Sequence, residues 1–217
     1  MPLTHRKPRP LSRDKQTFRD DRLLIIACDD TFAPKQYFDF FRIQRIQVHV
    51  VPTTDGTSNA QAVLDRLLQY DHQEHDERWL LLDTDHAIQG PHVRQFVAAL
   101  QTARQRGIRV ALSRPCFELW LLLHHVSENE VKELADCRAV DNRLREVLGT
   151  YDKTRLVAEH YPLKSVSEAC ARARRLDGAE GGGIPNNNST RVFEIWESVC
   201  EKALASQVPR ELRGLVR

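Results

Sequence analysis

The sequence predicts an α/β fold, in which a parallel β-sheet carries helices on both faces. Short, continuous apolar runs are typical of strands that are buried on both sides of such a sheet, and helical periodicity appears between them. The resulting order, β-α-β-α-β-α-β-α, implies right-handed crossovers between parallel strands. A chain of 217 residues with 41% hydrophobic content has room for one such domain and a helical extension.

The elements of the first half are predicted as follows. Apolar runs predict strands at residues 23–27, 46–51, 78–82 and 108–112. Helical periodicity predicts helices at residues 34–41, from a cap at Thr57 or Ser58 to residue 70, and at residues 91–106, where Gly107 ends the helix.

Beyond residue 125 the pattern is helical. Helices are predicted at residues 129–148, 153–158, 165–175 and 191–204, with Ser189 and Thr190 capping the last one after a Gly/Asn-rich loop. We therefore expect a basic flexible arm (1–20), an α/β domain (21–126), and a helical C-terminal region packed on it (127–217).

The overall charge is nearly balanced, with 32 basic and 30 acidic residues and a net charge of +2. Such a surface permits nucleic-acid binding without indicating it. The N-terminal arm is locally basic and could follow a phosphate backbone, or be a solvated tail. Its basic residues are Arg6, Lys7, Arg9, Arg13 and Lys15.

The five cysteines are scattered, odd in number and without CxxC spacing. This argues against a disulfide framework or a zinc site and predicts a reducing, cytoplasmic location. No apolar signal segment stands at the N-terminus, and the longest apolar run, 119–123, is too short to cross a bilayer. We expect no membrane association.

One carboxylate, Glu118, stands inside the otherwise apolar segment 113–125. The segment predicts a helix with Ser113 or Arg114 near the cap and Pro115 in the first turn. Burying an unpaired carboxylate costs several kcal/mol, so Glu118 is expected to have a cation, a metal or a catalytic task. The alternative is a partner for the helix dipole.

Acidic residues also follow two of the predicted strands. Asp29 and Asp30 follow the first strand, and Asp83 and Asp85 follow the third. Because ligands bind outside the carboxyl ends of parallel strands, these carboxylates are expected to lie close together. Clustered carboxylate oxygens suit Mg²⁺ or Mn²⁺ better than zinc.

Two kinds of site fit this pattern. A receiver-type phosphoacceptor would use Asp83 and the hydroxyl of Ser113, but no fifth strand ending in Lys follows Ser113. A Toprim-type site needs a general acid/base after the first strand and a metal-binding Asp-x-Asp pair after the third. Asp29, Asp83 and Asp85 stand at those positions. Toprim-type sites cleave or rejoin phosphodiesters.

The segment Ser113-Arg114-Pro115-Cys116-Phe117-Glu118-Leu119-Trp120 resembles the hallmark of the RloB family. Supporting elements are the arm 9–13, the Asp-x-Asp pair, Tyr151-Asp152-Lys153, and the Asn-rich stretch that ends in Ser189-Thr190. The resemblance implies a Toprim-like nuclease of bacterial restriction and phage-defence loci, typically beside an AAA-type ATPase. It leaves DNA or RNA open as the substrate, and a homo-oligomer is compatible with it.

Site roles follow from the strand-end acids and this resemblance together. Asp83 and Asp85 would bind Mg²⁺ or Mn²⁺; Asp29, with Asp30, would be a general base or a further metal ligand; Glu118 would complete the cluster. Candidate contacts to substrate phosphate are Arg114, His86 and Lys153. Trp79, Trp120, His124 and His125 are predicted to pack in the core or at a helix end.

The first strand departs from the family pattern. Asp29 stands for a Glu, Asp30 for a Gly, and Pro34 for a second Glu. Because Asp is one methylene shorter than Glu, the carboxylate oxygens of Asp29 are displaced, and a displacement of roughly 1 Å can lower the catalytic rate about 10²-fold. Either Asp30 supplies the missing carboxylate, or the chain is a catalytically degenerate nucleic-acid-binding or regulatory subunit of an ATPase complex.

Overall fold

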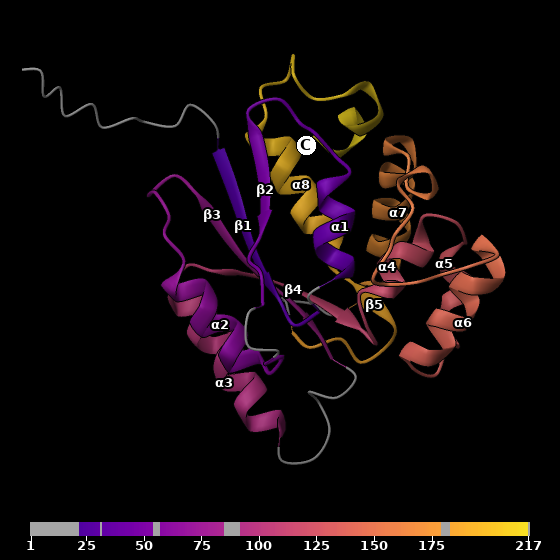
Figure 1. Cartoon of the computed structure of the whole chain (residues 1–217), viewed down its shortest axis with the longest axis horizontal. Coiled ribbons are helices and arrows are strands. Elements are labelled where there is room, and N and C mark those ends of the chain that lie inside the picture. The colour runs from indigo at the N-terminus through magenta and orange to yellow at the C-terminus, as the bar shows by residue number, and fades with distance from the viewer. Residues whose placement is uncertain (1–21, 31, 54–56, 85–91, 179–182, 217) are drawn as a thin grey trace, which may run out of the picture.

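A computed structural model describes residues 22–30, 32–53, 57–84, 92–178 and 183–216. Five strands form one sheet in the order β2-β1-β3-β4-β5 (Figure 1). Their bounds are Arg22–Cys28 (β1), Ile46–Val50 (β2), Glu77–Asp83 (β3), Arg109–Arg114 (β4) and Ser189–Thr190 (β5). The first four run parallel and β5 is antiparallel to β4, so the predicted α/β class is confirmed, with a mixed rather than a fully parallel sheet.

Both faces of the central strands are buried, as the apolar runs predict. Along β1, alternate residues enter two separate apolar cores, because successive side chains of a strand point to opposite faces. Leu24 and Ile26 belong to one core, Leu23 and Ile25 to the other. A strand in the middle of such a sheet has no solvated face, so it needs no polar alternation.

Helices α2 (Ala60–Gln69) and α3 (His92–Gln105) cover one face (Figure 1). Val63, Leu64 and Leu67 form the buried stripe of α2. Asn59 caps this helix by accepting a hydrogen bond from the Ala62 N–H at 3.0 Å, so the predicted cap at Thr57 or Ser58 was one to two residues early.

The other face carries the remaining helices (Figure 1). They are α1 (Ala33–Asp39), α4 (Glu118–Leu123), α5 (Glu128–Val131), α6 (Cys137–Leu148), α7 (Leu163–Leu176) and α8 (Val192–Lys202), with 3₁₀ turns at Ala158–His160 and Arg210–Leu215. Every residue of α4 is buried. Trp79 and Trp120 are both 0% exposed, which confirms them as core residues.

The structure corrects the predicted start of the Glu118 helix. Ser113 and Arg114 are the last residues of β4, and α4 begins at Glu118 itself. Pairing extends β4 this far, because Ser113 faces Asp83 of β3 on one side and Thr190 of β5 on the other.

Three further predictions were wrong. The helix predicted at 129–148 is broken into α5 and α6, because Asp136 caps α6 through the Ala139 N–H. The predicted helix at 153–158 is absent over residues 153–157, and Ala158 begins a 3₁₀ turn: the Asp152 side chain accepts from the N–H of Thr154 and favours a turn. Thr190 lies in β5, and the residue before α8 is Arg191, without a side-chain cap.

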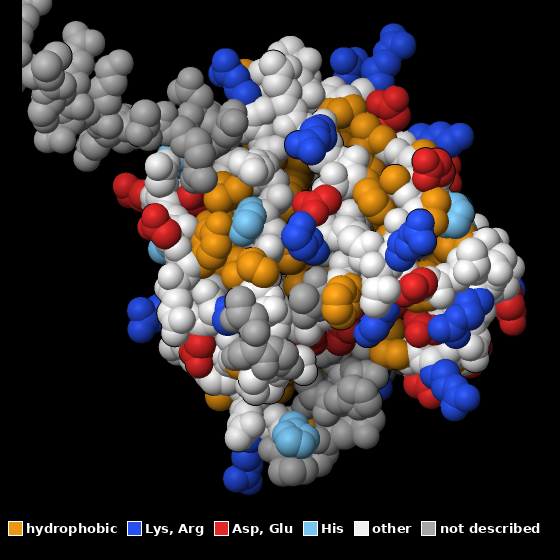
Figure 2. Space-filling model, in the orientation of Figure 1, with side chains coloured by type: hydrophobic (Ala, Val, Ile, Leu, Met, Phe, Trp, Pro, Cys, Tyr) orange, Lys and Arg blue, Asp and Glu red, His pale blue; other side chains and the backbone are white. Residues whose placement is uncertain are grey.

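Basic and acidic side chains are interspersed over the visible face of the molecule (Figure 2), in keeping with the small net charge. None of the helices in the described part of the chain combines the length and the apolar character that a membrane span requires. The predicted basic arm, residues 1–20, lies outside the part that the structure describes.

Candidate active site

The acids of the first and third strands meet at one edge of the sheet. Asp29 directly follows β1, and Asp83 is the last residue of the neighbouring parallel strand β3. The two carboxylate oxygens of Asp29 accept backbone hydrogen bonds, Oδ2 from the Asp83 N–H at 2.9 Å and Oδ1 from the Asp30 N–H at 3.1 Å. The structure therefore brings Asp29, Asp30 and Asp83 together.

Charge is unfavourable in this cluster. Burial raises the pKa of Asp29 to about 7, against the lowering effect of its backbone hydrogen bonds. The pKa of Asp83 is raised well above its ordinary value by burial, and further by the charges of Asp29 and Glu118. A neighbouring cation would relieve both the desolvation and the repulsion.

Glu118 enters the cluster from the first turn of α4. It is only 6% exposed, and the Tyr151 hydroxyl donates to its Oε1 at 3.2 Å. Burial raises its pKa, and the charges of Asp30 and Asp141 add to the effect. The helix dipole favours a carboxylate here, but the electrostatic coupling to Asp30 and Asp83 also makes Glu118 a member of the acidic cluster.

Lys153 is a cation at the rim of the cluster. Burial acts to lower its pKa, but the attraction of Asp30, Glu118 and other nearby acids outweighs burial and raises the pKa. The segment that carries Lys153 is joined to α1 by Gln36, whose side-chain amide donates to the Lys153 carbonyl at 3.0 Å.

Sequence reasoning missed two residues of this site, Asp141 and Tyr151. Asp141 lies on α6, and its pKa is raised by burial and by Asp30 against the opposing charges of Arg145 and Lys153. The sequence signal that could have found Asp141 was its place in the helix, next to Val140 and three residues before Leu144, both of which are buried. This spacing puts Asp141 close to the buried face of α6. The sequence alone did not indicate that this helix packs at the carboxyl end of the sheet.

Other predicted site residues are placed differently. Arg114 donates from Nη1 to the Pro185 carbonyl at 2.9 Å, which ties β4 to the segment before β5. The Ser113 hydroxyl is buried and hydrogen-bonded to the Thr190 hydroxyl at 2.8 Å. Asp85 and His86 lie outside the described residues.

The donor set has the right chemistry for a hard divalent cation, since it consists of carboxylate oxygens. Within the part of the chain that the structure describes, however, no group of three or more His, Cys, Asp or Glu side chains is arranged to hold a metal. Asp85, which was expected to bind the metal together with Asp83, lies outside the described residues.

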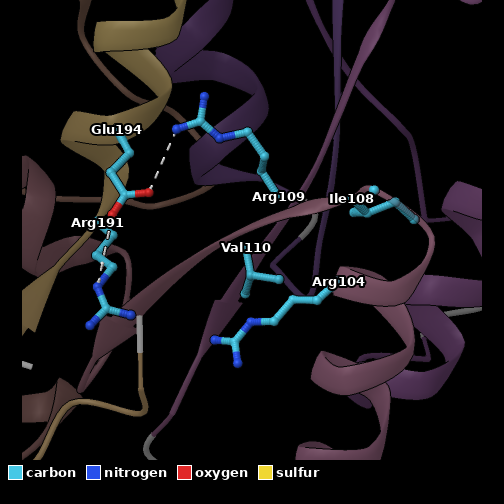
Figure 3. A pocket seen from close by; sticks show the side chains of 7 residues that line it. Arg104, Ile108, Arg109, Val110, Arg191 and Glu194 are labelled. Atoms are coloured by element: carbon cyan, nitrogen blue, oxygen red, sulfur yellow. Dashed lines mark ion pairs between the residues drawn. The ribbon is translucent and has the colours of Figure 1, made fainter. Parts of the chain in front are cut away.

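A hollow of about 360 Å³ lies at the other end of β4, near its first residues Arg109 and Val110 (Figure 3). Arg109 and Arg191 both line it and both face Glu194, at 3.9 and 4.0 Å. Arg191 also makes two hydrogen bonds to the Asp177 carboxylate, at 3.0 and 3.1 Å. Acids therefore compensate the charges of Arg109 and Arg191 in this hollow.

Comparison with known proteins identifies the family. The model of the RloB-like protein family matches residues 24–199, which is most of the chain. No curated protein and no solved structure matches. The matched range includes both acidic strand ends and the Glu118 segment. The chain belongs to the RloB-like protein family.

Proposed function

We propose that this RloB-like protein is a Mg²⁺-dependent, Toprim-like nuclease that hydrolyses phosphodiester bonds of DNA or RNA in bacterial anti-phage defence. The observation that carries the proposal is the meeting of Asp29 and Asp83 at adjacent strand ends, with Glu118 coupled to them. Buried carboxylates that raise one another's pKa are typical of functional sites. The defence role and an AAA-type ATPase partner rest on the family resemblance.

Each acid has a task in this proposal. Asp83, with Asp85, would hold Mg²⁺, which when bound polarises the phosphodiester and neutralises charge that develops on its oxygens. Asp29, at the end of β1 beside Asp83, would take up and release a proton as general acid/base. In the metal-free protein, burial raises its pKa to about 7. Glu118 would complete the acidic cluster, held in position by the Tyr151 hydroxyl.

Cations near the acids would bind the substrate. Lys153 is coupled to Asp30 and Glu118, so a phosphate placed at the acids would lie within its electrostatic reach. Arg114, which keeps further N–H donors besides the one bound to Pro185, and His86 are the other proposed phosphate contacts.

A regulatory subunit without catalysis is the second candidate. Both oxygens of Asp29 accept backbone N–H groups, which is also the arrangement of an acid that only fixes two strand ends. The Asp29-Asp30 pair departs from the family pattern at the same place. In that case the protein would bind nucleic acid or the ATPase and cleave nothing.

Cleavage and metal binding distinguish the two candidates. Purified protein is incubated with supercoiled plasmid or total tRNA in Mg²⁺, in Mn²⁺ and in EDTA, alone and with an AAA-type ATPase of the kind that the family resemblance implies. We expect metal-dependent cleavage that falls by about 10²-fold or more in Asp83→Asn and in Asp29→Asn. Calorimetry with Mn²⁺ measures binding directly, and Asp83→Asn should abolish it.

Matched controls use acids away from the cluster. Asp65→Asn, on the exposed face of α2, is the control for the two Asp variants and should keep full activity. A third site variant, Glu118→Gln, has Glu146→Gln on the exposed surface of α6 as its control, and this control should also keep full activity. Cleavage that survives both Asp83→Asn and Glu118→Gln would refute the proposed site. A folded wild-type protein with neither Mn²⁺ binding nor cleavage would favour the regulatory subunit.

A further inference from the structure

We propose that Phe32 is a stacking platform for an unpaired nucleobase, so that the substrate enters the acidic cluster as a single strand. The inference rests on the proposed nuclease function and adds the substrate class to it. Single-stranded RNA and single-stranded DNA share the chemistry that the site would recognise, namely an exposed base face next to a phosphate.

Phe32 presents its ring to solvent at 49% exposure. The other large hydrophobic side chains that are exposed among the described residues are aliphatic: Val157, Leu204 and Val216. A single exposed apolar residue needs no special explanation. Phe32 is distinguished by the place where its ring is held.

The backbone of Phe32 is fixed against the acidic cluster. Its N–H donates to Asp30 Oδ1 at 2.8 Å, and its carbonyl accepts from the Gln36 side-chain amide at 3.1 Å. The same amide donates to the carbonyl of Lys153, and Gln36 Oε1 accepts from the Leu156 N–H at 2.9 Å. One side chain thus holds the aromatic residue and the lysine segment together.

The resulting surface combines the two features that single-strand binding needs. Stacking on an aromatic ring holds a base regardless of its identity, and a nearby cation holds the backbone phosphate. Phe32 supplies the ring, and Lys153, coupled to Asp30 and Glu118, supplies the cation beside the acids. A base stacked on Phe32 would place the adjoining phosphate near the acids.

A duplex does not offer this contact, because its bases are already stacked and paired and a base must be extruded first. The aromatic side chains close to Glu118 cannot replace Phe32, because Phe117, Trp120 and Tyr151 are buried. Loss of the Phe32 ring should therefore affect single strands and leave duplex binding almost unchanged.

Fluorescence anisotropy tests the proposal on the full chain, with Ca²⁺ in place of Mg²⁺. The probes are a single-stranded RNA, a DNA of the same sequence, the duplex DNA, and a DNA strand with abasic sites. Phe32→Ala should weaken binding of both base-carrying single strands by about 5- to 150-fold. Phe32→Trp should retain it, and Phe32→Leu, which keeps apolar bulk without a π-face, should behave as Phe32→Ala.

The controls isolate stacking from loss of apolar surface or of fold. Leu204→Ala removes another exposed hydrophobic side chain, beyond the end of α8, and should bind as wild type. The abasic strand should bind wild type and Phe32→Ala equally, and the melting temperatures of all variants should agree. The ratio of the affinities for the RNA and for the DNA of the same sequence shows whether the site prefers ribose or deoxyribose.

Three results would overturn the inference: duplex binding equal to single-strand binding, an unchanged affinity in Phe32→Ala, or no binding of either single strand. Failure of the nuclease proposal has a different signature. Phe32-dependent single-strand binding without cleavage in Mg²⁺ would refute catalysis and keep the stacking site. Metal-dependent cleavage of single strands and duplex at the same rate in wild type and in Phe32→Ala would keep catalysis and refute the stacking site.

Discussion

Asp29, Asp83 and Glu118 are held where ionisation is unfavourable, since burial raises the pKa of each of them. A protein gains no stability from such an arrangement, and functional sites commonly carry this kind of cost. Each of these acids was foreseeable, because it follows a predicted strand or interrupts an apolar run. Asp141 was not, because its place depends on how distant segments pack. Tyr151 was noted only as part of Tyr151-Asp152-Lys153, and its contact with Glu118 depends on the same packing.

Replacing Asp83 by Asn should therefore separate stability from function. Without added metal, at about pH 8, we expect Asp83→Asn to raise the free energy of unfolding by about 1–2 kcal/mol, because the neutral amide removes the cost of burying a carboxylate and its repulsion with Asp29 and Glu118. Mn²⁺ at about 100 times its dissociation constant should stabilise wild type by about 2.7 kcal/mol and leave the variant unchanged. Chemical denaturation measures both effects.

Asp65→Asn serves as the control for this comparison, because Asp65 lies exposed on α2. Its free energy of unfolding should equal that of wild type both without metal and with Mn²⁺. A metal-free Asp83→Asn protein less stable than wild type would mean that the Asp83 carboxylate supports the fold. The proposed repulsion would then be wrong.

At the scale of elements, a buried polar chain joins the helices on the Glu118 side of the sheet. Trp196 Nε1–H donates to the Tyr37 oxygen at 3.1 Å, and Tyr37 is 3.1 Å from His124 Nε2. His124 Nδ1 is 2.7 Å from the Ser165 oxygen, and the Ser165 hydroxyl donates to the Pro162 carbonyl at 2.8 Å. All donors and acceptors are satisfied only if the imidazole is neutral, with its proton on Nδ1.

This network makes stability depend on pH through His124, which closes α4 and is buried. Burial lowers its pKa well below the ordinary value, and the positive charges of His125 and Arg172 lower it further. The unfolded chain takes up this proton below about pH 6.5 and the folded chain does not. The free energy of unfolding should therefore fall as the pH drops below 6.5, by up to about 1.4 kcal/mol per pH unit.

Urea unfolding between about pH 5 and pH 7.5 measures the effect. His124→Gln should be less stable at neutral pH but should show a shallower pH slope than wild type. The exposed His72 offers the matched variant, His72→Gln, which should keep the wild-type slope. Equal slopes for wild type and His124→Gln would exclude His124 as the titrating group.

The elements also show where sequence reasoning ends. The four parallel strands were predicted almost to the residue, because burial on both faces requires continuous apolar runs. The strand β5 was missed, since two residues have no periodicity and its place is set by pairing with Ser113 and Arg114. The break between α5 and α6 was missed because the cap at Asp136 lies inside an otherwise helical pattern.

Across the whole molecule, the two halves of the sequence share one of the two hydrophobic cores, the one on the Glu118 side of the sheet. A single cluster of buried side chains extends from Leu24 in β1, through Trp120 in α4, to Leu215 near the C-terminal end. The acidic site is assembled in the same way, with Asp29 and Asp83 from the first half and Tyr151 from the second. Folding of the core and assembly of the site are therefore expected to be one event.

A fragment of residues 21–126 tests this coupling. It would keep the four parallel strands but lose the helices that cover α4, with more than a dozen buried core residues, among them Val166, Ile195 and Trp196. Each fully buried side chain of this kind contributes about 1.5–3 kcal/mol, and a domain has only about 5–15 kcal/mol in total. We expect the full chain to unfold in one cooperative transition and the fragment to show none, by circular dichroism and calorimetry. A cooperative transition in the fragment would instead show that the α/β part is a domain able to fold alone, with the C-terminal helices docked on a finished core.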